Sequence, residues 1–159
     1  MADKVDTTER MIQALRDSDI GDDLPDEVLA HIARIGSILE LDPGEVLTEE
    51  GAEGHHAYIL LKGTIDVQIC TDDPNSPVGT RVLHPGSIIG EMSILEHSKR
   101  TARTIAGERA TLLCMRDEDL WTVFDKEPLA GYLFMRNLAR VLSRRLRVTN
   151  LAIRHSFFT

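Results

Sequence analysis

The chain has 159 residues, a length typical of one domain with one hydrophobic core. It carries 18 Lys and Arg against 26 Asp and Glu, so its formal net charge is −8 at pH 7. Such an acidic chain repels nucleic acid at long range, and we expect no direct DNA binding by it. No apolar run predicts a membrane-spanning segment. The start, MADKVDTTER, lacks the apolar core of a secretion signal, so we expect a cytoplasmic protein.

Two helices are predicted before the first strand. Residues 7–18 form the first, with Thr7 or Thr8 as its cap. The stretch DDLPDEVLAHIARIG forms the second, in which Asp22 or Asp23 caps the helix and the proline occupies the first turn.

The pattern from residue 37 to residue 115 changes to short strands separated by turns, with no long helix between them. This spacing predicts a β-sandwich or jelly roll. We expect HAYILLKGTIDVQIC to form two strands that pivot at Lys62-Gly63, DDPNSPVG to be a loop, and TARTIAGERATLLCM to form a hairpin around Gly107. EMSILEH is too compact for a strand and predicts a single helical turn.

Helices return at the C-terminal end. RDEDLWTVFDKE predicts a short helix with Asp117 as its cap, and Pro128 opens a long helix that runs to about Ile153. The apolar residues of the long helix approach the spacing of a coiled-coil seam, which predicts a homodimer through this helix. They include Phe134, Leu138, Val141, Leu142, Val148 and Ala152.

Charge is distributed unevenly along the chain. Residues 128–159 contain six arginines and no acidic residue, whereas the rest of the chain is strongly acidic. Two interpretations follow: the arginines lie over the acidic body as a solvated helix face, or the basic segment binds an acidic partner.

The stretch GEMSILEHSKRTART contains groups that suit a sugar phosphate. Gly90 lets the backbone approach a ligand, and a helical turn that begins at Glu91 directs free N–H groups outward. Arg100 can bind phosphate oxygens with its planar fork, and Thr101 adds a hydroxyl donor. An ionised Glu91 only accepts hydrogen bonds, so it suits a ribose hydroxyl. The alternative is that Glu91 and Arg100 pair with each other across the loop.

The run GEMSIL followed by KRTA resembles the phosphate-binding cassette of cyclic-nucleotide-binding domains. This resemblance implies a mainly β fold with flanking helices: a double-stranded β-helix, or jelly roll, followed by a long C-terminal helix. It implies that Glu91 takes the ribose 2′-OH and that Arg100 pairs with the cyclic phosphate, assisted by Thr101 and by backbone amides near Ser93. The binding residues implied are Gly90, Glu91, Met92, Ser93, Arg100, Thr101 and Ala102.

The segment SRRLRVTNLA resembles the end of the C-helix in the catabolite activator protein family, the sensors of cAMP. In that family the helix forms a parallel dimer. The resemblance implies that Thr149 contacts the adenine and that Asn150 contacts the nucleotide of the partner subunit. The alternative is that Thr149 and Asn150 are fraying polar residues of a helix end.

Three segments are expected from the resemblance: an N-terminal helical segment (1–22), a cyclic-nucleotide-binding β-roll with flanking helices (23–127), and the long C-terminal helix with its tail (128–159). Activator proteins continue into a helix-turn-helix, whereas this chain stops at IRHSFFT. The resemblance therefore implies either a stand-alone sensor or a missing output domain.

The function expected is non-enzymatic sensing of a cyclic nucleotide, with an unidentified protein as effector. Thr149 favours cAMP, whereas Thr101 is similar to cGMP-responsive cassettes, and cAMP is the preferred ligand. A nucleotide-independent interaction module of the same fold is the alternative. A cupin-like metal enzyme is a third, but the adjacent His55 and His56 would point to opposite faces of a strand. No metal is therefore expected.

Overall fold

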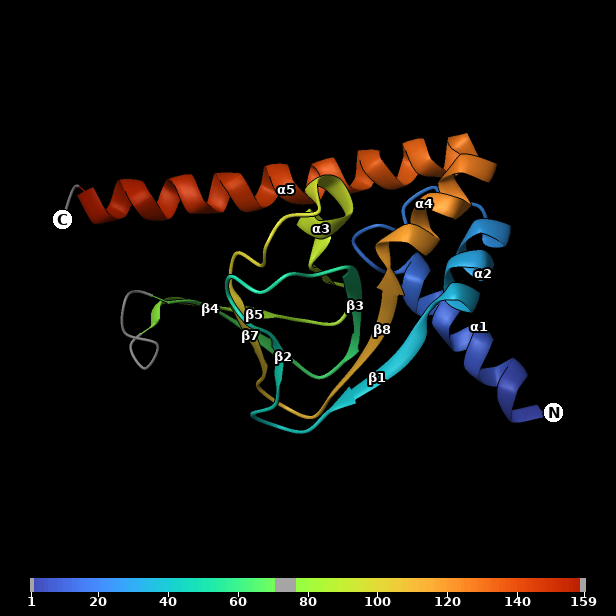
Figure 1. The fold of residues 1–159 in the computed structure, drawn as a ribbon, viewed down its shortest axis with the longest axis horizontal. Helices are drawn as coiled ribbons and strands as arrows, with labels where there is room; N and C mark the ends of the chain where they lie inside the picture. Colours follow the sequence, from blue (N-terminus) through green and yellow to red (C-terminus); the bar gives the residue numbers. More distant parts are fainter. Residues whose placement is uncertain (1, 71–76, 158–159) are drawn as a thin grey trace.

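The structure of the protein is a computed structural model that describes residues 2–70 and 77–157, and side chains within residues 8–69 and 81–155. Two helices precede a set of strands, and two more follow it, with one short helix inserted between strands (Figure 1). In chain order the elements are α1 (Ala2–Arg16), α2 (Asp26–Ile35), β1 (Ser37–Leu41), β2 (Val46–Thr48), β3 (His56–Lys62), β4 (Ile65–Cys70), β5 (Pro77–Leu83), β6 (Ile88–Ile89), α3 (Glu91–Glu96), β7 (Arg103–Ala106), β8 (Ala110–Arg116), α4 (Asp117–Lys126) and α5 (Pro128–Phe157).

Within the described residues, the strands form two antiparallel four-stranded sheets. One has the order β1-β8-β3-β6 and the other β2-β7-β4-β5. One apolar cluster contains residues from strands of both sheets. Its fully buried members include Leu60, Ile65 and Leu112. The predicted jelly roll with flanking helices and a long C-terminal helix is confirmed. The expected helical turn is also present, as α3.

The hairpin predicted around Gly107 is wrong. β7 pairs with β2 and β4, whereas β8 pairs with β1 and β3, so the two strands lie in opposite sheets. Gly107 packs against the side chains of Thr64 and Asp66, where the chain crosses between the sheets. Alternation of apolar residues along each strand could not reveal which distant strand would supply its hydrogen bonds.

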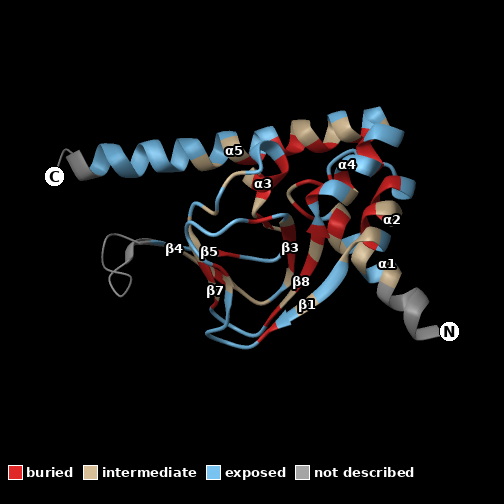
Figure 2. Ribbon diagram, in the orientation of Figure 1, coloured by how far each residue is buried: buried red, intermediate tan, exposed pale blue. Residues whose placement is uncertain are grey.

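A second apolar cluster lies between the first sheet and the helices. Phe134 of α5, Leu29 of α2 and Leu15 of α1 are fully buried there, together with Leu113 of β8. The central strands β3 and β8 are therefore covered on both faces, as their coloring in Figure 2 indicates. This double burial explains why the run AYILL contains no charged residue.

Each helix for which the sequence predicts a capping residue begins at a different residue from the one expected. Helix α1 begins at Ala2, so Thr7 and Thr8 lie inside it. The residue preceding α2 is Pro25 and that preceding α4 is Arg116, and neither makes a side-chain cap hydrogen bond. The aspartates expected to cap these helices bind elsewhere, because arginines of α5 and a serine of α3 offer them stronger or more buried donors.

Helix α5 has two unlike halves. Its first half is anchored by buried Phe134, Leu138 and Val141, whereas the residues from 146 to 155 are all exposed. In Figure 1 this second half extends past the strands, to the left of the view. Within residues 2–70 and 77–157, every helix is too short or too polar to cross a lipid bilayer.

The arginines of α5 lie mostly over the acidic body. Arg136 pairs with Asp23 at 2.9 Å, and Arg140 pairs with Asp22 at 3.0 Å. Arg144 pairs with an oxygen of Asp19 at 3.1 Å. Exposed pairs of this kind contribute only about 0–1 kcal/mol each. These contacts support the first interpretation of the basic segment, in which its charge orients the helix on the body.

Candidate functional site

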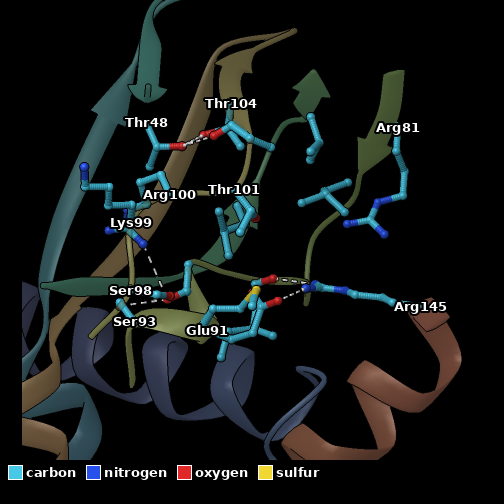
Figure 3. Close-up of a pocket in the computed structure, with 17 residues that line it drawn as sticks. Thr48, Arg81, Glu91, Ser93, Ser98, Lys99, Arg100, Thr101, Thr104 and Arg145 are labelled. Atoms are coloured by element: carbon cyan, nitrogen blue, oxygen red, sulfur yellow. Dashed lines mark hydrogen bonds and ion pairs between the residues drawn. The ribbon is translucent and has the colours of Figure 1, made fainter. Parts of the chain in front are cut away.

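The segment between β6 and β7 connects the two sheets and forms one wall of a cavity of about 90 Å³. Figure 3 shows the residues that line this cavity. All seven residues expected from the cassette are among them: Gly90, Glu91, Met92, Ser93, Arg100, Thr101 and Ala102. The structure thus brings the expected acidic, basic and hydroxyl groups to one place.

Two glycines make room for the guanidinium of Arg100. Gly90 precedes α3 in the left-handed region, with φ of 74°, and a Cβ there would overlap the guanidinium. A Cβ at Gly54 would overlap the same group from the loop before β3. A side chain at either position would move the guanidinium from this place, and Gly90 also has a backbone conformation that glycine adopts easily.

Arg100 is held at the cavity wall by backbone carbonyls. Its Nη2 donates to the carbonyl of His56 at 2.7 Å, and its Nη1 lies 3.4 Å from the carbonyl of Gly90. The guanidinium carbon lies 5.9 Å from the ring centroid of Tyr58, within the range of a cation–π contact. Burial raises the pKa of Tyr58, so its ring remains a neutral phenol beside the cation. Two segments that are distant in sequence, the start of β3 and the residue before α3, therefore orient the guanidinium.

Glu91 does not pair with Arg100, the alternative that the sequence left open. Its Oε1 accepts a hydrogen bond from Nη1 of Arg145 at 2.6 Å. Nη2 of Arg145 donates to the carbonyl of Ile88, also at 2.6 Å. The side chains of Arg145 and Glu91 are only 20% and 10% exposed, so this ion pair is largely shielded from water. It connects α5 directly to α3.

The cavity is cationic although the chain is acidic. Glu91 is the acidic member of its lining, and the basic members are Arg81, Lys99, Arg100 and Arg145. Burial, and next the charge of Arg145, lower the pKa of Arg81. This crowding of like charges would be relieved by an anion. The geometry therefore suits a small anionic ligand that also offers a hydroxyl to a carboxylate.

Sequence reasoning missed Arg81 and Arg145. Arg81 lies on β5, and nothing in the sequence around it distinguishes it from other polar strand residues. Arg145 lies within SRRLRVTNLA, the segment singled out for Thr149 and Asn150, so a signal for it was present. The structure places Thr149 and Asn150 on the exposed half of α5, outside the cavity lining. The hydroxyl of Thr149 donates to the carbonyl of Arg145, one helical turn earlier, at 3.0 Å.

Comparisons with known proteins agree on one family. The family model described as cyclic nucleotide-binding domain matches residues 38–127. Over 110 residues the chain is 38% identical to the cyclic AMP receptor protein of Thermus thermophilus, which covers 69% of this chain and 49% of that protein. Over 130 residues it is 31% identical to the human cGMP-dependent protein kinase 2, covering 79% of this chain and 17% of the kinase. The chain therefore spans half or less of these relatives.

A solved structure shows the same relationship in three dimensions. The crystal structure of the Thermus thermophilus catabolite activator protein superimposes with a TM-score of 0.74 and 25% sequence identity. The superposition covers 89% of this chain and 64% of that one. This structural match extends beyond residues 38–127, the part of the chain that the family model matches.

Proposed function

The chain belongs to the cyclic nucleotide-binding domain family, and from this membership we propose that it is a non-enzymatic sensor of cyclic nucleotides, with cAMP as the preferred ligand. The observation that carries the proposal is the cationic cavity in which Arg100 and Glu91 both lie. A cyclic nucleotide offers a phosphodiester anion and a ribose 2′-OH. These are the complements of a guanidinium fork and of an ionised carboxylate.

Arg100 is proposed to bind the cyclic phosphate. Its carbonyl contacts with His56 and Gly90 fix the plane of the guanidinium, so little side-chain entropy remains to be lost on binding. The start of α3 adds backbone N–H groups, and Thr101 adds a hydroxyl at the same wall. This pre-orientation supports Arg100 as the principal phosphate contact.

Signalling is proposed to begin with competition for Glu91. The cavity of about 90 Å³ is smaller than the roughly 300–1,000 Å³ typical of small-molecule sites. A ribose hydroxyl that approached Glu91 would meet Arg145, which already occupies one of its oxygens. Binding would thus displace Arg145 and weaken the contact between α5 and α3. The nucleotide would select an arrangement with a different position of α5, a population shift that an effector protein reads.

Cyclic nucleotide is expected to stabilise the fold against heat. At a free concentration ten times Kd, mass action contributes about 1.4 kcal/mol, which shifts the Tm of a chain of this size by about 3–6 °C. Thermal unfolding with cAMP, with cGMP and with 5′-AMP as a control measures this. Tm values that stay constant up to millimolar cAMP and cGMP, with no nucleotide released from the purified protein, would favour the nucleotide-independent interaction module.

Base selection is proposed to lie in α5, because phosphate and ribose are the same in cAMP and cGMP. The greater identity with the cyclic AMP receptor protein than with the cGMP-dependent kinase supports cAMP. Thr149, one turn after Arg145, is proposed to contact the adenine, and Asn150 to contact the nucleotide of the partner subunit. Both would need α5 to move, since neither lines the cavity.

Thr149→Val is expected to weaken cAMP binding by about 2- to 13-fold, the range for one neutral hydrogen bond of about 0.5–1.5 kcal/mol. Valine keeps the branched shape and removes the hydroxyl, so cGMP affinity should change less and the ratio of the two affinities should approach one. Calorimetry with both nucleotides measures this ratio. An unchanged ratio would assign base selection to the cassette.

Trp121 provides an internal reporter of the signal. It is the single tryptophan of the chain, and its indole N–H donates to the carbonyl of Ile94 in α3 at 3.1 Å. If α3 and α4 move relative to each other when the cavity fills, this hydrogen bond changes and the emission maximum of Trp121 shifts. We expect a saturable shift during nucleotide titration. Nucleotide binding in calorimetry with constant emission would place the movement elsewhere.

A homodimer through α5 is also proposed. Leu146, Val148, Leu151 and Ile153 are large apolar side chains on the exposed half of the helix, and each is about half exposed or more. Large apolar side chains this exposed on a projecting helix are typical of an interaction site. The seam is shorter than the sequence indicated, because Phe134, Leu138 and Val141 are already buried against the body.

A further inference from the structure

Three potential metal ligands from segments that are distant in sequence lie close together next to α3. His55 lies directly before β3, His97 directly after α3, and Asp117 is the first residue of α4. Their ligand atoms all lie within 4.8 Å of one another. None of the three lines the cationic cavity, so this group is separate from the site described above.

The carboxylate of Asp117 has an unpartnered oxygen. The residue is 1% exposed, its Oδ1 accepts from the hydroxyl of Ser93 at 3.1 Å, and its Oδ2 is buried with no hydrogen-bond partner among the described residues. Leaving a buried charged oxygen unsatisfied is costly, and such a group requires a partner or an ion. The nearby groups that could accompany an ion are the two imidazoles.

Both imidazoles are available for coordination. His55 and His97 are exposed, and within the described part of the chain neither ring makes a hydrogen bond or an ion pair. Their backbones are fixed: the carbonyl of His55 accepts from the N–H of Asp117 at 3.0 Å, and the N–H of His97 donates to Ser93 at 3.1 Å. The side chains can therefore rotate while their attachment points stay in place.

We propose that His55, His97 and Asp117 bind one Zn²⁺ ion, with a water or an external ligand in the fourth position. Two imidazoles and a carboxylate are a ligand set that zinc prefers, whereas Mg²⁺ and Ca²⁺ prefer oxygen alone. Bonds of about 2.0–2.1 Å in a tetrahedron separate the ligand atoms by about 3.3 Å. Rotation of the exposed imidazoles closes the remaining gap, and the ion supplies the missing partner of Asp117.

Occupancy of this site would couple to the cassette. Ser93 lines the cationic cavity and hydrogen-bonds the same carboxylate, and His97 is the residue that ends α3. An ion would join the end of α3 to the starts of β3 and α4. This site has no local sequence motif: His55 and His56 are adjacent, whereas His97 and Asp117 come close to His55 only in the fold.

The test is titration of tag-free protein with Zn²⁺ by calorimetry and with Co²⁺ by visible absorption. One ion per chain and an absorption band of tetrahedral Co²⁺ are expected. His55→Ala and His97→Ala should each weaken Zn²⁺ binding at least about tenfold, since loss of even an outer-shell partner costs about 10- to 100-fold. His84→Ala, an exposed histidine outside the group, should bind like the parent.

Several results would overturn the proposal: no Zn²⁺ binding, a Zn²⁺ affinity that the two alanine variants leave unchanged, or an equal loss of affinity in His84→Ala. Because both ligand histidines are exposed, their variants should fold, and unchanged circular dichroism without metal checks this. Nucleotide affinity plays no part in these readouts, so the result is independent of the proposed sensing function.

Discussion

Arg100→Ala is expected to reduce the affinity for cyclic nucleotide by at least about 100-fold. A hydrogen bond to a charged group contributes about 1.5–3 kcal/mol, and a guanidinium fork can supply two to one phosphate. The substitution also removes one of the positive charges with which the cavity attracts an anion. Calorimetric titration with cAMP measures the change directly.

Arg100→Lys tests whether the fork or the charge alone matters. Lysine keeps the charge but is a point donor, so we expect a loss of at least about tenfold. Arg109→Ala is the matched control, because Arg109 is an exposed arginine that pairs with Glu40 outside the cavity. Since Arg100 also bonds two carbonyls, Tm without ligand should be compared for each variant. Affinity in Arg100→Ala close to that of the parent would remove Arg100 from the site.

Leu151→Glu is expected to raise the Kd of the dimer by at least about 100-fold. Leu151 is 54% exposed on the projecting half of α5, where a partner helix would cover it. The substitution would place two carboxylates in one apolar seam, and burial of each unpaired charge costs several kcal/mol. Sedimentation velocity over a range of concentrations measures the shift from dimer to monomer.

Leu129→Glu is the matched control for the dimer. Leu129 is 67% exposed in the first turn of the same helix, at the opposite end from the projecting half. Leu142 is less suitable as a test position than its place in the apolar pattern suggests, because it packs against the buried core. A parent protein that is monomeric at tens of micromolar would contradict the dimer, and with it the contact proposed for Asn150.

The elements that could be predicted are those whose information is local. Helix α3 and the cassette around it are contiguous in sequence, so composition and resemblance located Glu91 and Arg100 before any fold was known. The partner of Glu91 could not be found in this way. Arg145 is distant in sequence and reaches α3 only because buried residues such as Phe134 dock the first half of α5 on the body.

The same distinction explains the errors. The hairpin around Gly107 follows from two strands that are neighbours in sequence, but β1 and β3 pair with the two edges of β8 and leave no edge for β7. The cap assigned to Asp117 followed a rule for isolated helices. In the fold Ser93 offers that carboxylate a buried hydroxyl, which a helix considered alone does not contain.

Helix α5 can be considered as a lever with a short and a long arm. At 1.5 Å per residue its 30 residues extend about 45 Å. Arg145 lies only about 6 Å beyond the anchor at Val141, whereas Phe157 lies about 24 Å beyond it. A displacement of about 1 Å at Arg145 therefore becomes about 4 Å at the helix end. The side chains of residues 146–155 are all exposed, so this amplified movement occurs on the part of α5 that projects from the body.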